Sequence, residues 1–110
     1  MAAKRIYETD EVKSFVAGMS SASKRKYMQA RQVLADFGDL RYPLGEKVDG
    51  YDDVFVIRIL TKGNERFFYC FDEGDIIAVL HGFSKKTQRI QQRELSRALR
   101  VMNQLFGGEA

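Results

Sequence analysis

The feature that most constrains the fold is an apolar run in the second half of the chain, residues 76–80 with the sequence IIAVL. Five consecutive apolar residues leave no side for water, so the run predicts a central β-strand with both faces covered. His81, the only histidine, follows at once, and Lys85 and Lys86 come soon after. A rigid strand that ends in an imidazole and two ammonium groups is suited to present polar chemistry at the rim of a core.

The length and composition indicate a soluble globular protein. A chain of 110 residues forms one domain, 1–110, with a small core. Its 45% hydrophobic and 30% charged residues are ordinary proportions for this class, and no apolar run is long enough to span a bilayer. The N-terminal residues lack the apolar core of a signal peptide, so we expect a cytoplasmic protein without a membrane partner. The net charge of +3 suits an anionic partner, either nucleic acid or an acidic protein.

The cysteine and histidine counts restrict the chemistry further. Cys70 is the only cysteine, which rules out an internal disulfide. One cysteine and one histidine cannot form a structural zinc site, and no paired-carboxylate motif has a suitable context for another metal. We therefore expect a site without a metal and a protein without a cofactor.

The first third of the chain has helical spacing. Residues 4–8 allow a brief edge strand. Thr9 and Asp10 are N-cap candidates for a first helix, which Gly18 interrupts. A second helix follows and ends at Gly38, a typical C-cap residue. The pattern predicts a helical hairpin.

The remainder predicts three strands and a final helix. Residues 39–53 are polar and contain the only proline, so they are interpreted as an ordered surface loop. Strand-like segments occupy 54–60, 65–72 and 75–83, and the short turn signals between them favour an antiparallel meander. A helix over 91–106 is stopped by two glycines. The predicted fold class is α+β, with the N-terminal helical hairpin packed on a small antiparallel sheet and a C-terminal helix.

Polar residues within the apolar strands carry the chemical signal. Arg58, Arg66 and His81 lie on the three predicted strands. An unpaired buried guanidinium is costly, so each arginine must reach water, an acid or a ligand. Two fixed cations and one titratable group suit an RNA phosphate: cleavage by the adjacent 2′-hydroxyl needs a base, an acid and positive charge on the phosphorane.

Each of these residues also has a purely structural interpretation. His81 can be a hydrogen-bonded core residue, and the pair Lys85 and Lys86 can be a solvated turn. The two strand arginines can form ion pairs with nearby acids, of which the candidates are Asp52, Asp53, Glu65 and Asp72. Tyr42 and Tyr51 in the loop are candidates for stacking on a base. The sequence alone does not choose between these alternatives.

Three segments taken together resemble a known family. They are PLGEKVDGYDDVFVIRI at 43–59, ERFFYCFDEGDIIAVLHGFSKKTQ at 65–88, and ELSRA at 94–98 in the final helix. In this order they resemble the RelE/ParE toxin superfamily, within it the HigB-like, phage-associated branch, over residues 40–102. The resemblance implies the RelE-like fold and a type II toxin that cleaves mRNA, often on the ribosome. It also implies a small antitoxin as partner, commonly of the helix-turn-helix type.

Positions that match the family's motifs give the expected site. The resemblance implies four catalytic residues, which are Arg58, Arg66, His81 and Lys85. Three more are expected to bind RNA, namely Lys47, Lys86 and Arg89. One position departs from the pattern, because many relatives have a glutamate where this chain has Val56. Two other functions stay open, a ParE-type inhibitor of a protein target without nuclease activity and a phage-derived binding module.

Overall fold

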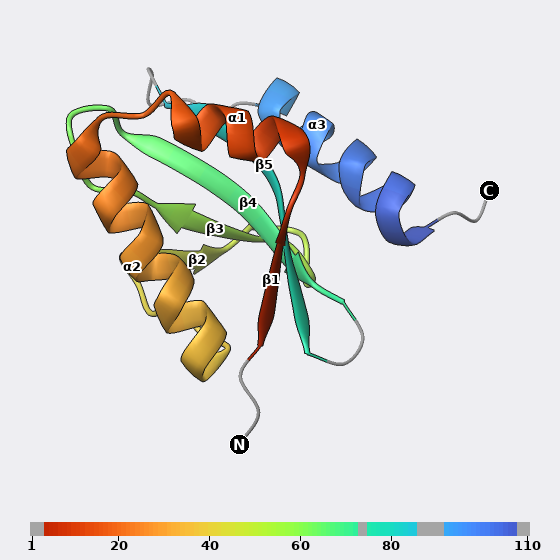
Figure 1. Ribbon diagram of the computed structural model, residues 1–110. Helices are drawn as coiled ribbons and strands as arrows, with labels where there is room; N and C mark the ends of the chain where they lie inside the picture. Colours follow the sequence, from red (N-terminus) through yellow and green to blue (C-terminus); the bar gives the residue numbers. More distant parts are fainter. Residues whose placement is uncertain (1–3, 73–74, 86–91, 108–110) are drawn as a thin grey trace.

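The computed structural model describes residues 4–72, 75–85 and 92–107, which form one five-stranded sheet and three α-helices (Figure 1). The first half contains β1 (Arg5–Glu8), α1 (Asp10–Ala17), α2 (Ser21–Phe37) and β2 (Gly45–Lys47). The second half contains β3 (Phe55–Arg58), β4 (Glu65–Phe71), β5 (Ile76–Ser84), α3 (Gln92–Met102) and a π-helical turn (Asn103–Gly107). This architecture confirms the predicted α+β class.

The sheet has the strand order β1-β5-β4-β3-β2. Strands β2 to β5 pair antiparallel, as the short turn signals predicted. The brief edge strand allowed at residues 4–8 forms as β1 and adds parallel to β5. The apolar strand β5 is therefore flanked by strands on both sides.

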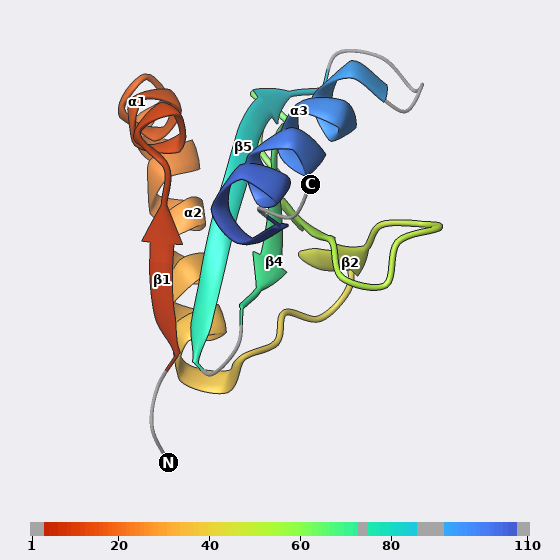
Figure 2. The same ribbon diagram turned by 90° about the vertical axis from the view of Figure 1, so that its right-hand side faces the viewer.

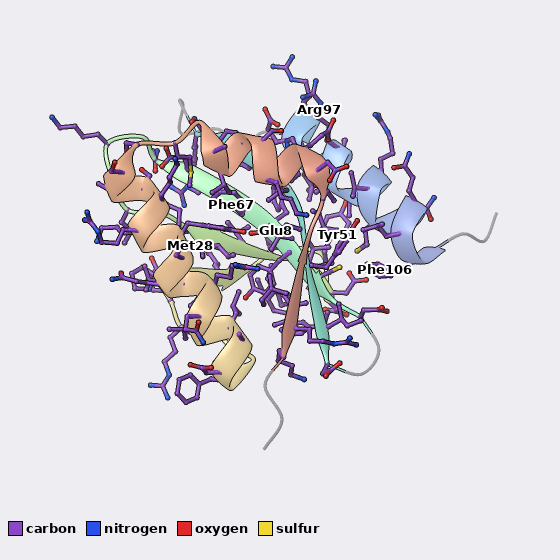
Figure 3. All side chains as sticks on the ribbon, in the orientation of Figure 1. Glu8, Met28, Tyr51, Phe67, Arg97 and Phe106 are labelled. Atoms are coloured by element: carbon purple, nitrogen blue, oxygen red, sulfur yellow. The ribbon has the colours of Figure 1, made fainter. Side chains whose placement is uncertain are left out.

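Helices cover both faces of the sheet, which confirms the prediction made from the apolar run. Figure 2 shows α1 and α2 on one side of the sheet and α3 on the other. The core under α1 and α2 contains Phe67, Ile77 and Val79 from the sheet, and Figure 3 shows Phe67 between these helices. The core under α3 contains Ala78 and Leu80. Side chains alternate along a strand, so β5 supplies both cores.

A β-bulge in β5 sets the direction of its polar end. Phe68 pairs with His81, but the next residue of β4, Tyr69, pairs with Val79, so Leu80 has no partner in the ladder. An extra residue shifts the alternation by one position. Both Leu80 and His81 consequently lie on the α3 face of the sheet, where Leu80 joins the core and His81 reaches α3.

The predicted helix boundaries are set by capping residues. The Thr9 hydroxyl accepts a hydrogen bond from the Val12 amide at 3.1 Å, which fixes the start of α1. Ser20 caps α2 in the same way. Gly38 ends α2 with φ of +71°, a left-handed conformation that glycine adopts without strain.

The loop predicted over residues 39–53 is wrong in part, because it contains the edge strand β2. Backbone pairing of Glu46 with Val56 creates this strand, and its three residues are too few for apolar alternation to reveal it. The last helix is also shorter than predicted: α3 ends at Met102 and the chain continues as the π-helical turn. The turn predicted at 73–74 and Gly108 lie outside the described residues. Within the described part, none of the helices combines the length and apolarity that crossing a membrane requires.

Gly82 of β5 leaves room for two aromatic rings, Phe67 of β4 and Phe15 of α1. A Cβ atom at this position would stand 2.7 Å from a ring carbon of Phe67 and 2.8 Å from one of Phe15. We expect Gly82→Ala to destabilise the fold by about 1–3 kcal/mol, because two packed rings would have to move. Chemical denaturation measures this loss. Gly18→Ala is the control, since its nearest neighbour is a backbone oxygen 3.7 Å away; equal midpoints for the two variants would contradict the packing described.

Candidate functional site

A cavity of about 250 Å³ opens on the α3 face of the sheet, beside the N-terminal half of α3. Its polar wall includes Glu46, Lys47, Arg58, Arg66 and Lys85, and we call it the arginine cavity. Phe68 and Phe83 form part of its apolar wall. Four residues expected from the sequence to act on RNA therefore meet in one place, although they come from four different segments.

The sheet register brings the two arginines together. Arg58 of β3 pairs directly with Arg66 of β4, so their side chains leave the sheet on the same face. Two guanidinium groups side by side repel each other. The arrangement requires negative charge nearby, from the protein or from a ligand.

The protein supplies only part of that negative charge. Arg58 forms an ion pair with Glu46, and its guanidinium lies 5.3 Å from the centre of the Tyr42 ring. Arg66 donates to the side-chain oxygen of Asn64 at 3.2 Å. Among the described residues, the buried Nε atoms of both arginines have no hydrogen-bond partner. Two donors are thus left without an acceptor in a cavity lined by four cations and by the carboxylates of Glu46 and Asp49.

Burial and neighbouring charge both act on the pKa of Arg66. Burial, and then the neighbouring charge of Arg58, lower the pKa of Arg66 from its usual value, while Glu46 acts in the opposite direction. A guanidinium stays protonated at neutral pH despite such a shift. A bound anion would counter both the desolvation and the repulsion, so the cavity is suited to an anionic ligand.

Asn64 fixes the position of a third cation. It sits in the turn between β3 and β4 with φ of +50°, which asparagine tolerates better than most residues. The side-chain amide of Asn64 donates a hydrogen bond to the backbone carbonyl of Lys85 at 3.0 Å. The backbone carbonyl of Asn64 accepts one from the backbone amide of Lys85, also at 3.0 Å. Because the same side chain accepts from Arg66, one residue orients Arg66 and holds the backbone of Lys85.

The other predicted RNA-binding residues have different positions. Lys47 lines the arginine cavity, and its ammonium group contacts Asp52 at 3.0 Å on the exposed rim. Lys86 and Arg89 lie outside the described residues. Tyr42 is 71% exposed, and Tyr51 is 37% exposed. Of these two rings, Tyr42 is the one beside the cavity arginines.

His81 lies next to the arginine cavity but does not line it. Its Nε2 atom is 2.6 Å from a carboxylate oxygen of Glu94 in α3, and both side chains are largely buried. Its ring stacks on Phe83, which is the cross-strand partner of Arg66. His81 and Arg66 are thus diagonal neighbours on one face, with about 7–8 Å between such positions. The structure separates the imidazole from the arginines by one aromatic ring.

His81 opens instead into a second and larger cleft. This cleft measures about 820 Å³ and lies between α1 and α3, with β5 at its floor; we call it the α1–α3 cleft. Asp10 and Glu11 of α1 line one wall, and Arg97 and Arg100 of α3 line the other. The predicted catalytic residues are therefore divided between two adjoining hollows.

Sequence reasoning missed the acid that pairs with Arg58. The four acids proposed as partners of the strand arginines are not the ones used, because Arg58 pairs with Glu46 and Arg66 contacts Asn64. Glu46 is the cross-strand neighbour of Val56, the position at which the family resemblance led us to expect a glutamate. Strand β2 thus supplies a carboxylate from the neighbouring strand. The sequence did not indicate Glu46 as the partner of Arg58, because residues 39–53 were assigned to a loop.

Potential metal ligands are dispersed in the described part of the chain, where no three His, Cys, Asp or Glu side chains form a group able to hold a metal ion. Cys70 is buried in the core under α3, and burial raises the pKa of its thiol to about 12. A thiol with such a pKa is a poor nucleophile at neutral pH. Among the described residues, the charged and titratable side chains in or beside the arginine cavity are its four cations, Glu46, Asp49 and the adjoining His81.

Comparisons with known proteins agree with this architecture. The family model of the phage-derived protein Gp49-like matches residues 14–103. The solved structure of a mutant of the E. coli toxin RelE in the free state superposes with a TM-score of 0.68 at 14% identity, covering 89% of this chain and 96% of that one. Among curated proteins, none shows significant sequence similarity. The expected RelE-like fold is confirmed, and the chain belongs to the phage-derived Gp49-like family.

Proposed function

We propose that this protein is the toxin of a type II toxin–antitoxin system and that it cleaves mRNA without a metal ion. The observation that carries the proposal is the convergence of Arg58, Arg66, Lys85 and Lys47 on one cavity, with two buried guanidinium Nε donors that lack an acceptor within the described structure. Membership of the Gp49-like family and the fold of the toxin RelE support the same role. Cleavage of the mRNA would inhibit its translation.

The arginine cavity accounts for the binding of the scissile phosphate. Arg58 and Arg66 offer planar donors to the two non-bridging oxygens, and their mutual repulsion falls when a phosphate lies between them. During attack the phosphorane gains a further negative charge, and the fixed cations stabilise that charge without rearranging. Lys85 and Lys47 at the rim bind the flanking phosphates, a role that we extend to Lys86 and Arg89.

The proton transfers require a base and an acid. The 2′-oxygen forms a bond to phosphorus, the bond to the 5′-oxygen breaks, and the products are a 2′,3′-cyclic phosphate and a 5′-hydroxyl. Glu46 is placed to accept the 2′-hydroxyl proton, since its carboxylate already lies beside Arg58. His81, a diagonal neighbour of Arg66, is the proposed donor to the 5′-oxygen, and Lys85 is the alternative donor.

The partners follow from the proposed toxin role. The target is mRNA in the cytoplasm, held on the ribosome, and the inhibitor is a small antitoxin of the helix-turn-helix type from the HigB-like branch. The net charge of +3 and the open arginine cavity suit an acidic antitoxin segment. An acidic segment bound in the cavity would neutralise its cations and prevent the RNA phosphate from binding there.

The first test concerns the cavity arginines and Glu46. We expect Arg58→Lys and Arg66→Lys each to lower the cleavage rate by about a hundred- to a thousandfold, because lysine keeps the charge but loses the planar fork. Glu46→Gln should cost about a hundred- to ten-thousandfold, since the amide cannot accept a proton. The measurement is cleavage of an mRNA by purified protein, with and without ribosomes.

Arg5→Lys is the matched control for these variants. Arg5 is also a strand arginine with an acid partner, Asp75 at 3.4 Å, but it lies on β1 at the opposite edge of the sheet. Cleavage should persist in EDTA when the ribosomes stay intact. If all three cavity variants remain fully active and toxic, the nuclease site is wrong and a ParE-type inhibitor of a protein target becomes the better explanation.

A second test separates catalysis by His81 from a structural role. If His81 donates a proton, His81→Gln should slow cleavage by about a hundredfold or more, whereas Glu94→Gln should act mainly on stability. If the pair only attaches α3 to the sheet, both variants should lower the denaturation midpoint and leave the cleavage rate of folded protein unchanged. Circular dichroism confirms folding, and the pH–rate profile of Glu94→Gln shows whether the carboxylate tunes the imidazole.

A third test addresses the antitoxin. Co-expression with the product of the adjacent gene should give a complex with simple stoichiometry that suppresses cleavage. Salt should weaken the association if charge complementarity drives it. Two folded proteins that fail to associate at physiological salt would argue against the toxin–antitoxin role.

A further inference from the structure

A row of arginines on α3 is not used by the proposed cleavage reaction. Arg93, Arg97 and Arg100 follow one another at i, i+4 and i+7, so they form a single stripe along the helix. All three side chains are exposed, and none pairs with a carboxylate of the described residues. We call this row the α3 stripe.

The packing of α3 fixes the direction of the stripe. Leu95 and Ala98 on the opposite side of the helix are buried against the sheet. The His81–Glu94 contact of 2.6 Å attaches the first turn as well. The stripe therefore presents three positive charges from a helix that is held firmly on the sheet. Figure 3 shows Arg97 on α3 at the edge of the molecule.

Two other sets of basic residues in the described part of the chain can be compared with the stripe. Arg5, Arg31, Lys47 and Arg58 each have a carboxylate partner. The exposed run 24–26 on α2 contains three consecutive cations, but consecutive residues on a helix point about 100° apart. Neither set offers three aligned positive charges.

The chemistry of the stripe points to a nucleic-acid backbone. From Arg93 to Arg100 the helix rises about 10 Å, a length that covers roughly three phosphates of one strand in a duplex. The exposed positions between 92 and 104 include no aromatic residue, so the stripe lacks the stacking surfaces with which proteins hold single-stranded bases. Contacts limited to the backbone are typical of double-helical RNA recognition.

The α1–α3 cleft limits where such a backbone can lie. Arg97 and Arg100 form one wall of the cleft, while Asp10 and Glu11 on the other wall would repel phosphates. An RNA helix in contact with the stripe would therefore lie along the outer side of α3 and not across the cleft. The arginine cavity borders the other side of α3 through Leu95.

We propose that the α3 stripe is a second RNA-binding surface, which docks the protein on the phosphate backbone of a double-helical RNA segment while the arginine cavity holds the single strand to be cut. The proposal rests on the proposed function in one respect, that the natural ligand is RNA. Binding by the stripe does not require cleavage, so the two can fail separately.

The experiment compares Arg93→Gln/Arg97→Gln/Arg100→Gln with the parent. The probe is a fully 2′-O-methylated RNA duplex of about 16 base pairs, which cannot be cleaved by 2′-hydroxyl attack. Fluorescence anisotropy gives the affinity over a series of salt concentrations. The matched control is Lys24→Gln/Arg25→Gln/Lys26→Gln, which removes the same charge from α2.

The stripe variant should bind the duplex more weakly and with a smaller salt dependence. Losing about three phosphate contacts reduces the magnitude of the slope of log K against log salt by roughly 2.1 to 2.7, so the fall in affinity between about 50 and 200 mM salt should shrink by a factor of about 20 to 40. The control variant should change the slope by less than the loss of one phosphate contact would. At saturating concentration, cleavage of a short single-stranded RNA should equal that of the parent.

Three results would overturn the proposal. The first is an unchanged slope in the stripe variant, and the second is an equal loss in the control. The third is normal duplex binding combined with loss of the co-expressed antitoxin, which would make the stripe a protein-binding surface. If instead no RNA is cleaved but duplex binding depends on the stripe, the docking surface stands and the nuclease proposal fails.

Discussion

The burial of β5 on both faces is the constraint on which the rest of the structure depends. Its apolar residues require a helical layer on each side of the sheet, which α1 and α2 provide on one face and α3 on the other. Helix α3 packs on β5 and β4 and leaves the outer strands β3 and β2 less covered on that face. The arginine cavity lies at this boundary, where side chains have rigid backbones but can still reach a ligand.

Within the cavity, charge is concentrated more than stability alone would favour. The register that places Arg58 beside Arg66 creates a repulsion that Glu46 offsets only in part. The lowered pKa of Arg66 reflects burial first and this repulsion second. Structures retain unfavourable electrostatics of this kind mainly at sites that bind a ligand. A bound phosphate would supply acceptors for the two Nε atoms, which have none among the described residues.

Helix α3 connects the separate parts of the proposed function. Glu94 holds His81, Leu95 borders the arginine cavity, and the exposed arginines face outward. A change in how α3 sits on the sheet would alter the position of His81 and of the stripe together. Leu95 and Ala98, both buried in the core under α3, attach the helix to the sheet.

The sequence by itself determined the elements, because local signals are sufficient for them. Capping by Thr9 and Ser20, the stop at Gly38 and the run of residues 76–80 specify helices and a buried strand through interactions within a few residues. The resemblance to RelE-like toxins also indicated Arg58, Arg66, His81 and Lys85 as candidate site residues. Only the tertiary structure decided the partners. Glu46 reaches Arg58 because β2 pairs with β3, and His81 turns toward Glu94 because a single extra residue in β5 reverses the alternation. Strand register and bulges arise from contacts between distant segments, so no pattern along the chain reveals them.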